Sequence, residues 1–414
     1  MSLSRRRFVG MVATLGLTAC VSREGPGGEA DVPPWVRPHL RGRDDDPRAA
    51  ALRWFDEARL GMFVHWGVWG PRHAEWAMFS QKIDLPEYQA LARGFRGEAF
   101  DACALVALAR AAGMRYITFV AKHHDGFCLW RSAHTPWNSW DYPARRDFLR
   151  ELSEACAEAG LPLFVYYSLG LDWTHPGFLP RSRYPFATPD TPTGRARDAA
   201  WREADFESYR RFCLDQLEEL CGNYGPLAGF WFDPLGALLA NESLFRTEEI
   251  YARIRRLQPH ALILNKTGVT GTEDVVVGER ELASISRHYP GDGEAMRRIR
   301  ALADRAWGRY RLKKAEIAVA SQGTWAWSPS SACRPSDELH RMLALAAANN
   351  ANLLLNVGPM PDGSLPVDVC REFAALGTRL RSEGYPSLDR TGWLARREGP
   401  GGAVDGSEVE ATAR

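Results

Sequence analysis

The sequence predicts an α/β protein folded as a (β/α)8 barrel of the TIM type, regular or irregular. From residue 54 onward, short apolar runs alternate with amphipathic segments of helical length, which is typical of parallel strands joined by helices. Polar, ionisable and aromatic residues follow these runs, at the place where barrel enzymes hold their active sites. With 414 residues and 45% hydrophobic content, the chain is long enough to bury such a core in one or two domains.

Eight apolar runs predict eight strands, and their lack of alternation indicates strands that are covered on both faces. In chain order they are Leu60–His65, Tyr116–Lys122, Leu163–Ser168, Gly229–Asp233, Ala261–Lys266, Val275–Glu279, Glu316–Ser321 and Asn352–Val357. The sixth run has the weakest strand pattern. Helical patterns between the runs include Phe100–Ala112, Asp147–Ala159, Trp201–Cys221, Glu248–Leu257 and Asp337–Asn349.

The residues at the ends of the predicted strands converge on one rim of the barrel. In chain order they are His65, His123 and His124, Tyr166, Asp233, Lys266, Glu279, Trp325 and Asn356. Since that rim is the active-site face of a barrel, the arrangement predicts one site and not eight separate coincidences.

Asp233 is the first candidate for chemistry, because the aromatic run Gly229–Asp233 ends abruptly in its carboxylate. Pro234 and Gly236 follow, so the alternative is that Asp233 only caps the next turn, as Asp often does before Pro or Gly. The polar ends of the other strands favour the catalytic interpretation.

The first 20 residues predict an export signal. Ser4–Phe8 has a twin-arginine pattern, and the apolar segment Val9–Thr18 is too short to form a stable membrane span. Leu17–Cys20 resembles the lipobox of bacterial lipoproteins, in which the cysteine is lipidated; an ordinary cleavage region that contains a cysteine is the alternative. We expect a periplasmic or cell-surface lipoprotein, which meets the membrane only through a lipid at Cys20.

This signal sets the expected division of the chain. Residues 21–48, rich in Gly, Pro and charge, are predicted to form a flexible tether. Residues 49–388 form the expected catalytic barrel, and residues 389–414 form a carboxy-terminal tail.

Composition excludes some classes of partner and scaffold. The net charge of +1 gives no reason to expect a nucleic acid or an anionic membrane surface as partner. The eight cysteines are scattered without a CxxC pair or metal-ligand spacing, so we expect no disulfide framework. Fifteen tryptophans favour a sugar-binding cleft, because indole rings stack on sugar faces, although many tryptophans belong to cores.

Four motifs resemble the α-L-fucosidases of glycoside hydrolase family 29. They are Phe63–Gly67, Lys122–Phe127, Trp231–Asp233 and Asn352–Pro359, and the resemblance extends from about Trp54 to about Tyr385. It implies a retaining exo-α-L-fucosidase that acts on fucosylated glycans or oligosaccharides without a metal or organic cofactor. Many relatives carry a carboxy-terminal β-sandwich, which we do not expect in this chain.

The resemblance also implies catalytic roles. Asp233 matches the family's nucleophile, although Pro234 stands where the family usually has glycine. Glu279 is the expected acid/base, because Asp274–Glu279 resembles an Asp-aromatic-x-x-x-Glu segment with a valine in place of the aromatic residue. Glu273 is the second candidate, and Glu75 and Glu281 stay open; the acid must be a glutamate with a raised pKa near the leaving oxygen.

Sugar-binding residues follow from the same resemblance. His65, His123 and His124 are expected to hydrogen-bond the hydroxyls of fucose, because a neutral imidazole can donate and accept. The pair Glu75 and Trp76 is expected to contact the sugar as well. The open alternatives for Tyr166, Trp231 and Trp325 are walls around the C5-methyl group or barrel core.

One departure and one exclusion accompany these assignments. Lys266 stands near a position where relatives often have arginine, so the charge is kept and the bidentate fork is lost. A metal site at His123 and His124 is not expected, because adjacent residues on a strand point to opposite sides.

Two further hypotheses stay open. Lys266 and Pro234 motivate a related glycosidase for another sugar, such as an α-L-galactoside. A degenerate barrel that binds glycans without turnover, as a non-catalytic surface lipoprotein, is the third hypothesis. The presence of Asp233 together with both His123 and His124 argues against it.

Overall fold

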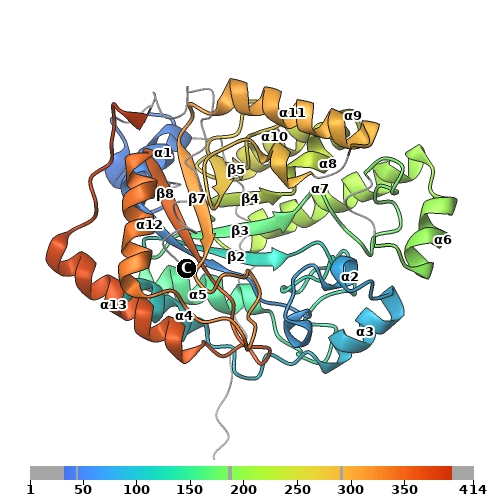
Figure 1. Ribbon diagram of the computed structural model, residues 1–414, viewed down its shortest axis with the longest axis horizontal. Coiled ribbons are helices and arrows are strands. Elements are labelled where there is room, and N and C mark those ends of the chain that lie inside the picture. The colour runs from blue at the N-terminus through green and yellow to red at the C-terminus, as the bar shows by residue number, and fades with distance from the viewer. Residues whose placement is uncertain (1–31, 43–44, 185–188, 290–291, 394–414) are drawn as a thin grey trace, which may run out of the picture.

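Eight parallel strands form one sheet in the order β5-β4-β3-β2-β1-β8-β7-β6 (Figure 1). The strands are β1 Leu60–Val64, β2 Ile117–Lys122, β3 Leu163–Ser168, β4 Gly229–Asp233, β5 Leu262–Asn265, β6 Val276–Glu279, β7 Ala315–Ala320 and β8 Ala351–Val357. This computed structural model describes residues 32–42, 45–184, 189–289 and 292–393. The predicted signal, Cys20 and most of the predicted tail lie outside the described residues.

The sheet curls into a nearly closed barrel. Its seam lies between β5 and β6, which are joined by the isolated bridge Leu264–Val275 and by a few backbone hydrogen bonds, such as that from Val277 N–H to the carbonyl of Lys266 at 2.7 Å. All other neighbours pair through parallel registers, such as Phe63 with Asn356 between β1 and β8, and the pairing of β2 with β3 has one register shift between Val120 and Lys122. The predicted (β/α)8 barrel is therefore confirmed, with an irregular seam at the sixth strand.

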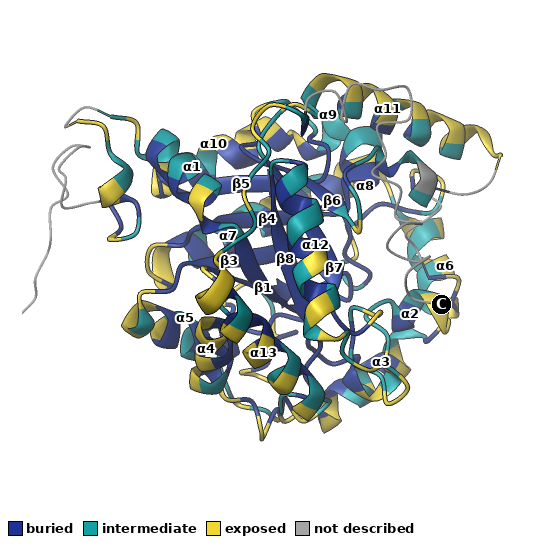
Figure 2. Cartoon of the chain, turned by 60° about the vertical axis from the view of Figure 1, so that its left-hand side comes forward, coloured by how far each residue is buried: buried dark blue, intermediate teal, exposed yellow. Residues whose placement is uncertain are grey.

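Helices cover the outside of the sheet and leave the strands buried (Figure 2). The larger ones are α1 Pro47–Ala58, α3 Leu85–Gly94, α4 Ala102–Ala111, α5 Phe148–Ala159, α6 Pro192–Ala200, α7 Phe206–Asn223, α10 Thr247–Leu257, α11 Glu294–Tyr310, α12 Ser336–Ala348 and α13 Val367–Glu383. The shorter ones are α2 Ala77–Ser80, α8 Leu235–Ala240 and α9 Glu242–Phe245. Among the described helices, none is long and apolar enough to cross a membrane.

The barrel interior has its own apolar cluster, separate from the layer between strands and helices. Inward-facing residues such as Phe63, Tyr166 and Trp231 form it, and Trp54 and Phe55 of α1 join it from the amino-terminal ends of the strands. α1 thus plugs one end of the barrel, and the chemistry is left to the other end.

Two boundaries differ from the sequence analysis. The predicted helix Trp201–Cys221 begins only at Phe206, because the backbone of Arg202 is extended and Asp205 accepts its N–H at 2.8 Å. Part of the predicted tether packs on the barrel, since Val32 and Val36 are buried beside α1.

Candidate active site

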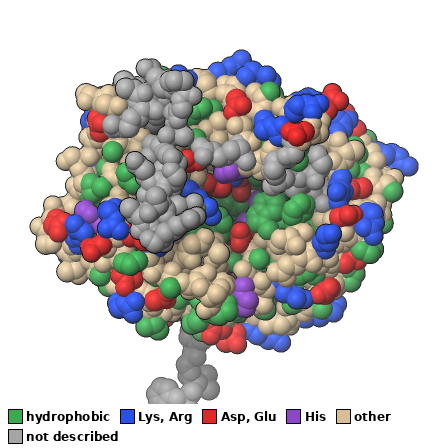
Figure 3. All heavy atoms as spheres, in the orientation of Figure 1, with side chains coloured by type: hydrophobic (Ala, Val, Ile, Leu, Met, Phe, Trp, Pro, Cys, Tyr) green, Lys and Arg blue, Asp and Glu red, His purple; other side chains and the backbone are tan. Residues whose placement is uncertain are grey.

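A cleft of about 220 Å³ opens at the carboxyl ends of the strands. Acidic and histidine side chains gather around a hollow on this face (Figure 3). The residues that line the cleft are Phe63, His65, Glu75, Trp76, His123, Tyr166, Tyr184, Trp231, Asp233, Pro234, Lys266, Glu279, His288, Tyr289 and Trp325. Nearly all of the predicted site residues are therefore brought together, from strands that are far apart in the sequence.

Asp233, the last residue of β4, is the most tightly held carboxylate in the cleft. Its Oδ2 accepts a hydrogen bond from the Tyr166 hydroxyl at 2.9 Å and lies 3.6 Å from Nε2 of His124. Its Oδ1 lies 2.9 Å from Nζ of Lys266. The residue is only 7% exposed, so Tyr166 and Lys266 replace water around its carboxylate.

Lys266 connects both candidate catalytic carboxylates. Besides Asp233, its Nζ contacts Oε1 of Glu279 at 2.8 Å. Burial lowers the pKa of Lys266, but the charges of Asp233 and Glu279 outweigh burial and raise the pKa above its usual 10.5. Lys266 is therefore a permanent cation between two acids, a role for which its single point of charge is sufficient.

The three histidines are neutral. Burial lowers the pKa of His65 to about 3 and the pKa values of His123 and His124 well below 6.5. His65 Nδ1 donates to the amide oxygen of Asn356 at 2.7 Å, which leaves Nε2 as an acceptor. The Ser168 hydroxyl donates to the Leu171 carbonyl, so Nδ1 of His124 must donate to Ser168 and its Nε2 is an acceptor too.

The expectation that His123 and His124 point to opposite sides is wrong. Both residues lie beyond the end of β2 at Lys122, where strand alternation no longer applies, and their ring centroids are 4.0 Å apart. His123 lines the cleft, whereas His124 contacts Asp233. Within the described part of the chain, no group of three His, Cys, Asp or Glu residues could hold a metal ion.

Two ring nitrogens in this cluster have unused hydrogen-bonding capacity. His123 Nδ1 and His124 Nε2 are buried and have no hydrogen-bond partner among the described residues. Buried polar atoms without a partner are rare, and that of His123, which lines the cleft, is suited to meet a ligand's hydroxyl group.

Glu75 is a second acid of the cleft. Burial raises the pKa of Glu75 above its usual 4.5, and its Oε2 accepts the N–H of Ala326 at 3.3 Å. The next residue, Trp76, packs edge-on against His124, with ring centroids 4.7 Å apart. Glu75 thus meets the raised-pKa criterion for a general acid, which the sequence could not assign.

Glu273, the second acid/base candidate, does not lie in the cleft. Its carboxylate accepts backbone N–H groups from Val269, Thr270 and Gly271 at 2.7, 3.1 and 2.9 Å. Both of its oxygens are used to hold this turn, so its role is structural. Glu281 is also absent from the residues that line the cleft.

The aromatic residues form both a wall of the cleft and part of the core. Trp231 and Tyr166 stack with their centroids 5.4 Å apart, and both line the cleft although they are about 1% exposed. Trp325 packs on His65 at 5.1 Å. The two open alternatives for these residues are therefore both realised.

Some cleft residues could not be found from strand ends. Tyr184 follows β3, and His288 and Tyr289 follow β6, all within loops without periodic pattern. His288 Nδ1 lies 3.8 Å from Oε2 of Glu279, and Tyr289 accepts the N–H of Gly236 at 2.9 Å. The one sequence signal for these residues is the abundance of aromatic residues in these loops, which favours an aromatic wall of the cleft.

Beneath the cleft, Glu316 of β7 holds Trp231 from below. The fully buried carboxyl group of Glu316 accepts the indole N–H of Trp231 at 3.0 Å and the hydroxyl of Tyr116 at 2.5 Å. Since Trp231 stacks on Tyr166, which donates to Asp233, Glu316 supports Asp233 through two aromatic rings.

Exchange of Glu316 for glutamine is expected to remove a pH dependence from the stability of the fold. Burial raises the pKa of Glu316 from 4.5 to about 7, so the folded state binds this proton more tightly than the unfolded state. The contribution of Glu316 to the free energy of unfolding is therefore greatest below about pH 4.5 and is lost as the pH rises to 7. Denaturant titrations at about pH 5 and about pH 8 measure this loss.

The exposed Glu98 provides the matched control, because Glu98→Gln leaves the barrel interior unchanged. The difference in stability between wild type and Glu316→Gln should shift towards the variant at the higher pH. A difference that stays constant between the two pH values would contradict a raised pKa at Glu316.

Comparison with known proteins agrees with this geometry. The family model described as Alpha-L-fucosidase matches residues 42–385. Human plasma alpha-L-fucosidase is 26% identical over 83% of this chain and 71% of its own length, and bovine tissue alpha-L-fucosidase is 32% identical over 88% and 74%.

Solved structures agree as well. Alpha-L-fucosidase isoenzyme 1 from Paenibacillus thiaminolyticus has a TM-score of 0.69 at 27% identity, covering 82% of this chain and 77% of that one. Alpha-L-fucosidase AlfC from Lactobacillus casei, in complex with its α-L-fucose product, has a TM-score of 0.66 at 28% identity, covering 80% and 98%. The chain therefore belongs to the α-L-fucosidase family of glycoside hydrolases.

Proposed function

We propose that the protein is a retaining exo-α-L-fucosidase, with Asp233 as nucleophile and Glu279 as acid/base. The contact of one Lys266 nitrogen with both acids carries the proposal. The Lys266 nitrogen lies 2.9 Å from Oδ1 of Asp233 and 2.8 Å from Oε1 of Glu279. The distance between these two oxygens therefore cannot exceed the sum of the two contacts. Retaining pairs are about 5–5.5 Å apart and inverting pairs about 6.5–9.5 Å, so the geometry supports retention.

The reaction has two steps. In the first, an Asp233 oxygen bonds to the anomeric carbon while the bond to the leaving oxygen breaks, and Glu279 gives its proton to that oxygen. In the second, Glu279 takes a proton from water, the water oxygen bonds to the anomeric carbon, and Asp233 leaves as a carboxylate. Tyr166 donates a hydrogen bond to Asp233 and Lys266 pairs with it, and these contacts hold the carboxylate in place for attack.

The neutral histidines support recognition of a sugar. Nε2 of His65 and His124 can accept from hydroxyl groups, and His123 offers its partnerless Nδ1. The cleft volume of about 220 Å³ supports one terminal sugar rather than an internal stretch of glycan. Trp231 and Trp325 provide the apolar surface that a deoxy C5-methyl group requires.

The first experiment follows an aryl α-L-fucoside by NMR as it is hydrolysed. Initial release of α-L-fucose supports retention, and initial release of the β-anomer would overturn it. Turnover of an α-L-galactoside faster than the fucoside would move the substrate assignment to that sugar.

Glu279→Ala then tests the acid/base, and Glu75→Ala is its matched comparison. We expect Glu279→Ala to lower kcat/KM by about 10²- to 10⁴-fold on fucosides with poor leaving groups, and much less on a nitrophenyl fucoside. The raised pKa of Glu75 makes it the rival acid. If leaving-group dependence appears in Glu75→Ala and not in Glu279→Ala, Glu75 is the acid.

We further propose that the protein is exported by the twin-arginine route and anchored by lipid at Cys20. The twin-arginine pattern and the lipobox-like Leu17–Cys20 support this proposal. Labelled palmitate that enters the wild type but not Cys20→Ala would support the anchor, and equal labelling would overturn it.

A further inference from the structure

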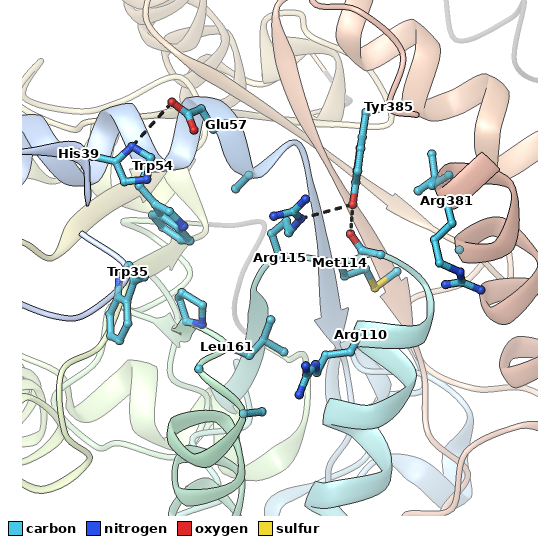
Figure 4. A pocket seen from close by; sticks show the side chains of 17 residues that line it. Trp35, His39, Trp54, Glu57, Arg110, Met114, Arg115, Leu161, Arg381 and Tyr385 are labelled. Atoms are coloured by element: carbon cyan, nitrogen blue, oxygen red, sulfur yellow. Dashed lines mark hydrogen bonds and ion pairs between the residues drawn. The ribbon is translucent and has the colours of Figure 1, made fainter. Parts of the chain in front are cut away.

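A second and larger cavity, of about 580 Å³, lies at the end of the barrel opposite the catalytic cleft. Figure 4 shows the side chains that line it. Its lining includes Ala58, Arg115 and Pro162, each of which comes directly or almost directly before a strand. The catalytic residues follow the strands. The barrel therefore separates the two cavities by the length of a strand, about 20 Å for six residues.

Arginines surround this cavity without carboxylate partners. Arg110, Arg115 and Arg381 are exposed, and none of them forms an ion pair with a described residue. The Arg115 side chain contacts Tyr385, with the hydroxyl at 3.5 Å and the ring centroid at 5.6 Å, and Arg381 donates to the Ala111 carbonyl at 2.9 Å and the Thr378 hydroxyl at 3.0 Å. Three unneutralised cations around one cavity favour an anionic ligand.

The acids near the cavity do not cancel this charge. Asp56 is held by Lys314 at 2.8 Å and by Arg390 at 2.7 Å. Glu57 is the one carboxylate that lines the cavity, and it lies 3.7 Å from His39. The near-zero net charge of the whole chain therefore conceals a local excess of positive charge.

Apolar and aromatic side chains form the rest of the lining. Trp35 and Trp54 lie on one side and Arg381 on the other, with Arg110 and Arg115 between them (Figure 4). Met114 and Leu161 also line the cavity. A tryptophan next to an arginine is suited to the boundary between lipid headgroups and acyl chains, because the amphipathic indole ring contacts both polar and apolar groups there.

We propose that this cavity receives the phosphate headgroup of an anionic phospholipid, so that this end of the barrel rests on a membrane surface. Arg110, Arg115 and Arg381 contact the phosphate groups, and Trp35 lies at the depth of the headgroups. The charge of the arginines and the mixed lining carry the proposal, which needs neither the lipid anchor nor fucosidase activity.

The position of Trp35 relates the proposed headgroup contact at this cavity to the proposed lipid anchor at Cys20. Trp35 lies 15 residues after Cys20, on the segment that continues from the proposed anchor. If the anchor is present, a lipid at Cys20 holds this cavity at the bilayer and turns the catalytic cleft outward. This orientation rests on the proposed anchor, whereas the headgroup contact does not.

The test is sedimentation with vesicles of the unlipidated chain that begins at residue 21 and so keeps every described element. We expect it to bind vesicles of equal parts phosphatidylglycerol and phosphatidylcholine, and not vesicles of pure phosphatidylcholine. Each of Arg110→Glu, Arg115→Glu and Arg381→Glu should weaken binding at least about fivefold, and salt should weaken it further.

Arg309→Glu is the matched control, because Arg309 is exposed on α11 and does not line the cavity. Turnover of the aryl fucoside should stay unchanged in all four variants, so failure here is distinguishable from failure of the proposed function. No binding to anionic vesicles, or equal weakening by Arg309→Glu, overturns the proposal. Vesicle binding that appears only after removal of residues 398–414 would overturn it in favour of the chain's own acidic tail as occupant.

Discussion

Asp233→Ala is expected to lower kcat/KM on an aryl α-L-fucoside by at least about 10⁴-fold, the scale seen when a nucleophile is removed. No other carboxylate receives Tyr166 and Lys266 as Asp233 does, at 2.9 Å each, within the described site. Without it, no covalent intermediate can form. Steady-state kinetics and an unchanged circular dichroism spectrum together measure the effect on chemistry alone.

Added azide supplies the matched control. The smaller alanine side chain leaves space beneath the sugar, so azide should attack directly and give β-L-fucosyl azide with inverted configuration. Recovery of activity with this product identifies Asp233 as the nucleophile. A variant that keeps a tenth of wild-type activity, or a rescued product of retained configuration, would refute the assignment.

Lys266→Met is expected to cause the second-largest loss. It leaves the buried Asp233 and the half-buried Glu279 without their shared cation, and loss of a partner from a buried ion pair destabilises a fold by about 3–5 kcal/mol. Removal of the shared cation changes the electrostatic surroundings of both carboxyl groups, so the acid limb of the pH profile should move. We expect kcat/KM to fall by about 10²- to 10³-fold, as for other removed charge stabilisers.

Lys266→Arg is the control, because it keeps the positive charge at this position and changes the shape of the side chain. Since the guanidinium keeps the positive charge, we expect the acid limb of its profile to stay in place and its kcat/KM to remain within about tenfold of wild type. Equal losses in the arginine and methionine variants would show that the fit of Lys266 matters more than its charge.

The fold could be predicted closely because its signal is local. Each strand is an apolar run buried on both faces, so the predicted and observed strand bounds differ by at most one residue at either end. The start of α7 could not be placed, because the periodicity that predicts a helix continues back through the extended Arg202. The plug of the barrel by α1 also depends on long-range packing that no local pattern carries.

The candidate site was only partly predictable, for a related reason. Strand ends locate Asp233, Lys266 and Glu279, since topology alone brings them to one rim. The choice between Glu273 and Glu279 depends on which carboxylate is used by backbone N–H groups, and this is a matter of three-dimensional contact.

The cleft residues on loops and the local charge of the second cavity could not be predicted either, because both depend on three-dimensional packing. Tyr184 and His288 reach the cleft through loops whose course follows from packing rather than from periodicity. The cationic cavity was hidden because net charge averages over the chain, whereas binding responds to the charges on one face.

The shared contact of Lys266 has a consequence for the whole catalytic cycle. In the retaining mechanism that we propose, an ionised Asp233 and a protonated Glu279 balance the lysine before reaction. In the intermediate, Asp233 is a neutral ester, but Glu279 has given up its proton and carries the negative charge instead. The lysine thus faces one anion in each half-reaction, and the enclosed site stays electroneutral from substrate to product. Negative charge passes from one side of the cation to the other, so no half-reaction requires an isolated ion in a site shielded from solvent.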